Sequence, residues 1–304
     1  ISACHAEGRG FESRPLRQIK GNTKVLPFLL CALAKGKQIM KHWMFVLFGL
    51  LFAGTLRANN LPFQVTYGDW QQGSVVGIQV DAVQQLLADN KPLIMDTQGN
   101  SLLGIGRDAS QVTLRWQDLS GVWHEHQQSI AQRSYDIQHI NGLPNNKVNP
   151  NPQEVAEIQA NNRLVAQTRA KPSVTMTPQL PMIWPTAGRI SGVYGSQRVL
   201  NGEPRRPHFG VDIAAPEGTP IVAPADGEVV LVHPNMVLTG QTLMIDHGLG
   251  LMSIYVHLSD MTVSLGDRVE RGQLIGKVGK TGRATGPHLH WGMTWRDVQI
   301  DAAK

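Results

Sequence analysis

Between Leu61 and His139 the chain consists of short runs in which apolar and polar residues alternate, and turn residues separate these runs. An alternation of period two places the apolar side chains on one face of an extended segment, so each run predicts a β-strand. The clearest runs are FQVTYGDW, SVVGIQV, QVTLRW and GVWHEHQQSI. The stretch DAVQQLLADN fits either a helical turn or a strand. We therefore expect residues 59–140 to form a small antiparallel β domain.

The pattern changes after this region. Residues 140–153, INGLPNNKVNPNPQ, are rich in proline and asparagine, which is typical of a boundary between domains. The segment that follows begins near a proline, carries acidic residues in its first turn and places apolar residues at roughly helical spacing. These apolar residues are Val155, Ile158, Leu164 and Val165. The spacing predicts one amphipathic helix within a linker that spans residues 141–180.

Residues 181–304 are dense in turns and again rich in strand-forming residues. Segments such as TPIVAPADGEVVLVHP, QTLMIDHG and LMSIYVHLS carry β-branched or alternating apolar positions bounded by glycine, and none reads as a helix of ordinary length. The pattern predicts a folded antiparallel sheet. The whole chain is therefore expected to be mainly β, with a linker helix between two β domains.

The start of the chain carries a different signal. The first methionine is Met40, and after Lys41 an apolar run of about ten residues leads to small residues around Ala58, which is the pattern of a secretory signal peptide. A membrane-spanning helix needs roughly 20 apolar residues, so we expect no stable membrane anchor. We expect residues 40–58 to be the signal peptide and residues 1–39 to be a non-native upstream translation. The mature protein is then expected in the periplasm or secreted.

The charge of the chain depends on this leader. The full sequence has 28 Lys and Arg against 23 Asp and Glu, but residues 1–58 hold nine of the basic residues and only two of the acidic ones. The remainder is slightly acidic, so we expect no nucleic-acid partner. Both cysteines, Cys4 and Cys31, also lie in the leader. A metal in the mature protein would have to be held by His, Asp or Glu.

Two histidines stand one residue apart in GPHLHWGM. In a strand, His288 and His290 project to the same side while Leu289 faces the other. Such a pair can serve one metal ion or simply lie at a surface. A second pair, in HEH at residues 124–126, has no carboxylate or third ligand at a recognisable spacing, which shows that the pair alone is a weak signal.

His208 and Asp212, in RRPHFGVDIAAPEGTP, strengthen the case for a metal. The β-branched residues and prolines around them argue against a helix, so the chain must bend for both side chains to reach one ion, and Gly210 is where it can. Zn²⁺ accepts imidazole nitrogen and carboxylate oxygen, and catalytic sites use three protein ligands. His208, Asp212 and one histidine of the HxH pair would make such a set.

Three motifs follow one another along the chain in an order that is rare by chance. They are HxxxD at His208, YVHLS at His257, and GxxTGPHLH, which contains His288 and His290. With their glycine-rich spacers these motifs resemble the lysostaphin-like (LytM-type) zinc metallopeptidase family over nearly all of residues 184–298. Residues 189–216 further resemble an exported Gram-negative branch with an N-terminal β domain. The resemblance implies a barrel-sandwich type fold in residues 181–304 and one Zn²⁺ per chain.

Carried over residue by residue, the family pattern implies that His208, Asp212 and His290 hold the zinc. His257 and His288 then remain unligated beside it as the catalytic histidines, and which of them is the general base is left open. A bound Zn²⁺ would polarise the scissile carbonyl and activate a water. Further candidates for substrate contact are Tyr255, Thr285, Arg205 and Arg206.

The family implies a periplasmic endopeptidase that cleaves cross-links or stem peptides of peptidoglycan. The alternative is a non-catalytic LytM-type regulator that binds and activates cell-wall amidases, but relatives of that type have usually lost zinc ligands. A lipoyl or biotinyl carrier, which GDRVERGQLIGKVG also resembles, lacks its lysine motif here. Proteins of cell-wall synthesis or division are candidate partners. The N-terminal domain could shield the site, bind glycan or recruit a partner.

Overall fold

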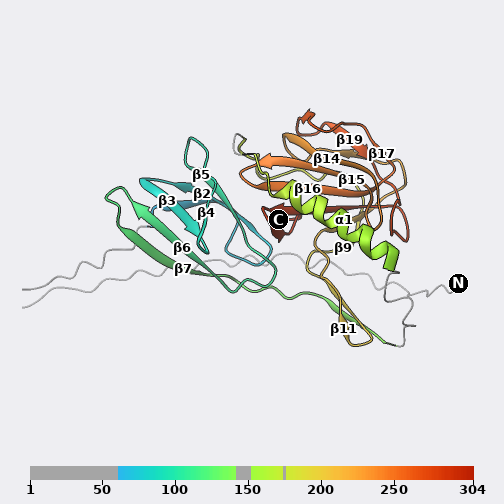
Figure 1. Ribbon diagram of the computed structural model, residues 1–304, viewed down its shortest axis with the longest axis horizontal. Coiled ribbons are helices and arrows are strands. Elements are labelled where there is room, and N and C mark those ends of the chain that lie inside the picture. Colours follow the sequence, from blue (N-terminus) through green and yellow to red (C-terminus); the bar gives the residue numbers. More distant parts are fainter. Residues whose placement is uncertain (1–60, 142–151, 174–175) are drawn as a thin grey trace, which may run out of the picture. The chain divides into compact units, whose positions relative to one another are not determined.

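The computed structural model describes residues 61–141, 152–173 and 176–304 (Figure 1). The expected signal peptide and the expected upstream segment lie outside these residues. The described chain forms strands β1 to β21 and one helix, α1, so the expected mainly β fold class with a linker helix is confirmed. No helix among the described residues is long and apolar enough to cross a lipid bilayer.

The first part of the described chain forms two small antiparallel sheets. One has the order β1-β2-β5, with bounds Phe63–Tyr67, Val75–Val80 and Asn100–Gly104. The other has the order β4-β3-β6-β7, with bounds Lys91–Pro92, Val83–Ala88, Gln111–Asp118 and Trp123–Ser129. The stretch DAVQQLLADN therefore contains a strand, β3, and not a helical turn. Val112 and Leu114 of β6 are buried while Thr113 between them is less so, as an alternation of period two requires.

Helix α1 spans Pro152–Arg169, within the predicted linker. A proline at the first helical position loses no hydrogen bond, and Glu154 in the first turn and Arg169 in the last turn complement the helix dipole. Of the predicted apolar positions, Val165 packs against a buried cluster of Leu231, Met236, Met244 and Met252. Leu164 is exposed instead. The helix is thus attached through a narrow apolar contact.

The largest sheet has the strand order β18-β14-β15-β16-β20-β12-β9, and β21 pairs with β20 at its side. In chain order its strands are β9 Arg189–Gly192, β12 Val211–Ala214, β14 Gly227–Met236, β15 Gly240–Gly248, β16 Leu251–Leu258, β18 Arg268–Val269, β20 His288–Trp295 and β21 Val298–Ile300. Every pair in it is antiparallel, as the sequence predicts. A smaller sheet has the order β13-β19-β17, with bounds Pro220–Val222, Leu274–Lys277 and Asp260–Met261.

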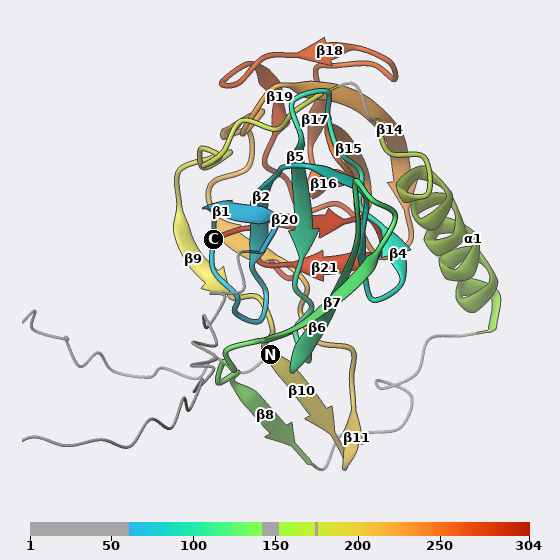
Figure 2. The ribbon, with the colours of Figure 1, turned by 90° about the vertical axis from the view of Figure 1, so that its left-hand side faces the viewer.

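The central strands β15 and β16 are buried along almost their whole length, so their two faces do not differ in exposure. On one side of β15, Leu243 and Ile245 belong to the main hydrophobic core. On the other side, Met244 belongs to the cluster that α1 covers through Val165. Figure 2 shows α1 beside β14, at the side of this sheet. The helix thereby covers part of one face of the sheet that also carries the candidate ligands.

One strand pair departs from the antiparallel rule. β8, Ile137–Ile140, pairs in parallel with β10, Gln197–Leu200, and β10 in turn forms a hairpin with β11, Glu203–Pro204 (Figure 2). Side chains from the segments that follow β5 and β7 also contact the rest of the described chain. Arg133 donates to Asp301 at 2.9 Å, and Arg107 Nε donates to the carbonyl of Gly195 at 2.9 Å. The hairpin β10–β11 is therefore held from the N-terminal side.

Candidate metal centre and active site

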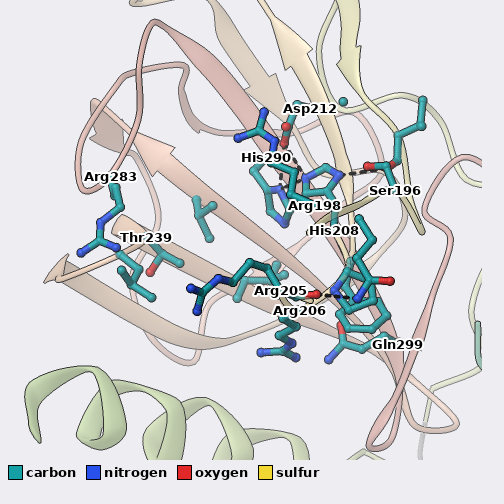
Figure 3. A pocket seen from close by; sticks show the side chains of 18 of the residues that line it. Ser196, Arg198, Arg205, Arg206, His208, Asp212, Thr239, Arg283, His290 and Gln299 are labelled. Carbon is teal, nitrogen blue, oxygen red and sulfur yellow. Dashed lines mark hydrogen bonds and ion pairs between the residues drawn. The ribbon is translucent and has the colours of Figure 1, made fainter. Parts of the chain in front are cut away.

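Three potential metal ligands converge in the largest sheet (Figure 3). His208 Nε2 lies 3.0 Å from Asp212 Oδ1 and 2.9 Å from His290 Nδ1, and the latter two atoms are 2.8 Å apart. The three atoms form a nearly equilateral triangle. In the described ranges 61–141, 152–173 and 176–304, this is the only group of three or more His, Cys, Asp or Glu side chains close enough to share one ion.

The strands bring these side chains together. Asp212 on β12 and His290 on β20 lie directly opposite each other in an antiparallel pair, and Leu289 is fully buried on the other face. His208 lies before β12, where its N–H donates to the carbonyl of Ser196 at 2.8 Å. The chain bends at Gly210, between His208 and Asp212, at the position where the sequence requires a bend.

Backbone groups hold the ligands in place. His208 Nδ1 donates to the carbonyl of Val193 at 3.0 Å, which turns Nε2 toward Asp212 and His290, and Nε2 would give up any proton on binding a metal. A Cβ added to Gly192 would lie 2.4 Å from Asp212 Oδ2, and one added to Gly210 would lie 2.6 Å from His290 Nε2. Both positions therefore require glycine. The sequence predicts a bend at Gly210. No sequence pattern predicts the need for glycine at residue 192, because Asp212, its partner across the sheet, is distant along the chain.

The residues of the triangle fit one Zn²⁺. Two imidazole nitrogens and a carboxylate oxygen bind zinc at about 2.0–2.2 Å, and tetrahedral ligand atoms at that radius are roughly 3.4 Å apart. The observed separations of 2.8 to 3.0 Å require only a small outward movement. Burial alone would raise the pKa of Asp212, but hydrogen bonds from His208 and His290 outweigh it and hold this pKa well below its usual range. The carboxylate is therefore ionised, as a ligand must be.

His257 and His288 lie side by side, with ring centroids 4.7 Å apart. His257 follows Val256, which pairs with His290 across β16 and β20. His257 Nδ1 donates to the carbonyl of Thr281 at 2.8 Å, and His288 Nδ1 donates to that of Gly286 at 2.9 Å. With Nδ1 donating, Nε2 of each ring is the nitrogen left to accept a proton. Burial lowers the pKa of His257 to about 4, so this ring is neutral near pH 7.

The structure places one further candidate, Tyr255, out of reach of a substrate. Tyr255 is completely buried, and its hydroxyl is hydrogen-bonded to Ser253 Oγ at 2.7 Å, so it belongs to the core. The sequence suggests otherwise because its neighbours alternate, but β16 is a central strand covered on both faces. Thr285 is exposed three residues before His288, and contact of its side chain with substrate stays a prediction. Arg205 and Arg206 line the groove described below.

The triangle opens onto a groove of about 1240 Å³. His208, Asp212 and His290 line it together with the segment from Ile190 to Arg206. Helix α1 forms a further wall through six residues, which are Ile158, Asn161, Asn162, Val165, Ala166 and Arg169. Figure 3 shows this helix along the edge of the site. The sequence predicts the helix but not this position, because its apolar spacing does not say which surface it covers.

Comparison with known proteins agrees with this geometry. The model of peptidase family M23 matches residues 206–302, which contain the triangle and both further histidines. Peptidoglycan DD-endopeptidase ShyA of Vibrio cholerae is 42% identical over 113 residues, which are 34% of this chain and 26% of ShyA. DD-carboxypeptidase/endopeptidase Mpg of Neisseria meningitidis is 43% identical over 103 residues, which are 34% of this chain and 24% of Mpg. This chain thus spans about a quarter of the length of these curated relatives.

A solved structure is similar over a longer range. A Pseudomonas aeruginosa protein assigned to peptidase M23 has 28% sequence identity and a TM-score of 0.59 to this chain. The similarity covers 78% of this chain and 94% of the other. The shared architecture therefore extends beyond the residues that the family model matches, into the sheets and the helix that precede them.

Proposed function

Residues 206–302 of this chain belong to peptidase family M23 as a LytM-type domain, and from this premise we propose that the protein is a zinc-dependent endopeptidase acting on the cross-links or stem peptides of peptidoglycan. The resemblance stated from the motifs is thereby confirmed. The observation that carries the proposal is the triangle of His208, Asp212 and His290 with two further histidines beside it. The names of two relatives, a peptidoglycan DD-endopeptidase and a DD-carboxypeptidase/endopeptidase, support the substrate class.

In this proposal His208, Asp212 and His290 hold the metal. When bound, Zn²⁺ would act as a Lewis acid on the scissile carbonyl and lower the pKa of a water molecule toward neutrality. The ligand set carries one negative charge, from Asp212, because both histidines bind as neutral rings. A divalent cation bound by these three ligands would therefore keep a net positive charge. Val193 fixes the ring of His208 through its carbonyl, and Gly192 and Gly210 leave room for the other two ligands.

His257 and His288 would move the protons of the reaction. Each ring keeps its own proton on Nδ1, in a hydrogen bond to a backbone carbonyl, and offers Nε2 as an acceptor. A ring that accepts a proton from the attacking water can then donate it to the leaving amine. Positioned acid–base groups of this kind contribute about 10²–10⁴-fold to a rate.

A non-catalytic regulator of wall amidases is the alternative. Such a protein would need neither three metal ligands nor two histidines with free nitrogens. The presence of all five side chains in one place supports the enzyme over the regulator.

Zinc content and turnover separate the two functions. We expect the purified wild type to hold about one zinc per chain and to release peptide fragments from purified peptidoglycan. Asp212→Asn should do neither. A wild-type protein that stays free of zinc, releases nothing and stimulates an amidase would establish the regulator and reject the enzyme.

We also propose that the protein works outside the cytoplasm. The pattern at residues 40–58 supports export with cleavage after Ala58, and peptidoglycan is the polymer that an exported wall hydrolase meets. The proposed mature chain has a β domain at residues 59–140, a linker at 141–180 and the peptidase domain at 181–304. Mass spectrometry of the protein from a periplasmic fraction tests this, because cleavage after Ala58 predicts Asn59 as its first residue.

A further inference from the structure

Four of the five arginines that line the groove with the metal triangle have no ion pair among the described residues. They are Arg169 at the end of α1, Arg198 on β10, and Arg205 and Arg206 after β11. Figure 3 labels the last three. We call them the groove arginines. The N–H of Arg205 donates to the carbonyl of Arg198 at 2.8 Å, so these two residues are neighbours across the β10–β11 hairpin. The guanidinium of Arg206 stands 5.2 Å from the centre of the Phe209 ring, one residue from His208.

No carboxylate within the described part of the chain forms an ion pair with these four side chains. Two acidic residues line the groove, and both have other contacts. Asp212 is bonded to His208 and His290, and Asp136 accepts a hydrogen bond from Gln138. A fifth lining arginine, Arg283, has Glu154 at 3.9 Å. The groove therefore has an excess of positive charge.

This arrangement is unfavourable without a ligand. The Nε atoms of Arg169 and Arg205 are buried and have no hydrogen-bond partner among the described residues. Buried polar atoms are nearly always satisfied in folded proteins, so two orphaned guanidinium nitrogens in one groove require an explanation. Burial and, to a smaller extent, the nearby charge of Arg206 together lower the pKa of Arg169 to about 10. An anion in the groove would offset the repulsion between these positive charges.

We propose that the groove arginines form a carboxylate-binding subsite beside the metal centre, which selects acidic peptides with free carboxylates as substrates. The guanidinium fork matches a carboxylate through two parallel hydrogen bonds, and an amide cannot accept both. This inference rests on the proposed function for the identity of the peptide. A peptide bond placed at the triangle would extend along the same groove, so the anionic groups that reach the arginines are those of the peptide itself.

Binding by the full chain in the presence of EDTA tests the subsite directly, because without a metal no carboxylate can bind as a metal ligand and no peptide is cleaved. The probes are a synthetic cell-wall stem peptide with free side carboxylates and the same peptide with these carboxylates amidated. Calorimetric titration should give at least about tenfold tighter binding of the acidic peptide, since hydrogen bonds to charged groups contribute that much. Equal affinities for the two peptides would overturn the proposal.

Variants identify the residues responsible. Arg169→Gln combined with Arg206→Gln should bring the two affinities within about twofold of each other, as expected when charged hydrogen bonds are lost. Arg169→Lys should keep only part of the preference, because it keeps the charge without the fork. Arg271→Gln, at an exposed arginine outside the groove, should leave the preference unchanged. A preference that survives in the double variant would assign it to other residues.

Folding does not confound this test. Replacing Arg169 removes a buried, repelled charge, so the melting temperature of Arg169→Gln should equal or exceed that of the wild type. The acidic peptide should raise the melting temperature of the wild type more than that of the double variant.

Turnover by the zinc-loaded protein separates this inference from the proposed function. Cleavage of both peptides with equal kcat/KM would reject the subsite and leave the endopeptidase intact. Tight, selective binding without any cleavage of either peptide or of purified wall would reject the endopeptidase and leave the subsite intact.

Discussion

Gly192 lies so close to Asp212 that a Cβ on residue 192 would be 2.4 Å from the carboxylate oxygen Oδ2. The two residues pair across β9 and β12, so the backbone at residue 192 cannot move away without disturbing the strand that carries the ligand. We expect Gly192→Ala to displace the carboxylate and lower zinc affinity about 10–100-fold, the range found when the groups that orient ligands are changed. Competition with a zinc-binding dye measures this affinity.

Gly210→Ala should have a similar effect through His290, because its Cβ would lie 2.6 Å from the imidazole. Gly106→Ala is the matched control: an added Cβ there would meet only Val298, at 3.6 Å, an ordinary van der Waals contact. If all three variants bind zinc as the wild type does, the close packing around the ligands has no role in metal binding.

Metal removal should destabilise the folded state. Zn²⁺ binds the folded chain through His208, Asp212 and His290, so at a free zinc concentration 1,000 times the dissociation constant it adds about 4 kcal/mol to the free energy of unfolding. EDTA should therefore lower the melting temperature of the wild type. Asp212→Asn should show no such response, because the ligand set is incomplete. An equal response of both proteins to EDTA would place the metal elsewhere.

The two unligated histidines should affect rate and not metal content. His257→Ala and His288→Ala should each lower kcat by about 10²–10⁴-fold, because each removes a group that can move a proton. Elemental analysis should find the zinc content of both variants unchanged. His139→Ala, at an exposed histidine on β8, is the control and should retain full activity. Loss of zinc in His257→Ala or His288→Ala would instead identify that residue as a ligand.

A buried histidine away from the metal predicts how stability depends on pH. His247 Nδ1 lies 2.8 Å from the carbonyl of Asp226 and Nε2 lies 2.7 Å from Ser253 Oγ, and burial lowers the pKa of His247 to about 4. The unfolded chain takes up this proton near pH 6.5, and the folded chain does so only near pH 4. The contribution to stability is therefore complete above pH 6.5 and is lost as the pH falls toward 4.

The expected slope is up to about 1.4 kcal/mol per pH unit between these two values. Urea unfolding of the metal-free protein at pH 7 and pH 5 measures it. His247→Gln should unfold more easily than the wild type at pH 7 but should lose less stability on going to pH 5. If the wild type and the variant lose the same amount, His247 is not responsible for the pH dependence.

Local patterns in the sequence predict the parts of the site that depend on neighbouring residues. The shared face of His288 and His290 follows from the period of a strand, and the bend at Gly210 follows from the spacing of His208 and Asp212. The pairing of Asp212 with His290 is different, because it depends on β12 lying next to β20. Only the resemblance to a known family indicates it before the structure is seen.

Other features depend on contacts between distant parts of the chain, which no local sequence pattern predicts. The period of a helix predicts α1, but its place on the groove depends on a cluster of buried side chains contributed by β14, β15 and β16. The burial of Tyr255 depends on β16 being a central strand, and strand periodicity does not distinguish central strands from edge strands. The parallel pair β8–β10 joins residues far apart in the chain, so the expectation of purely antiparallel sheets misses it.

The most direct test of the central claim is mass spectrometry of the fragments released from purified peptidoglycan by the zinc-loaded protein. The account predicts peptide fragments with new termini at a stem or cross-link peptide bond, and none of them from Asp212→Asn or His290→Ala. Fragments that the two variants release as fast as the wild type, or no fragments from a wild type that holds zinc, would contradict the claim that these side chains hold a catalytic metal.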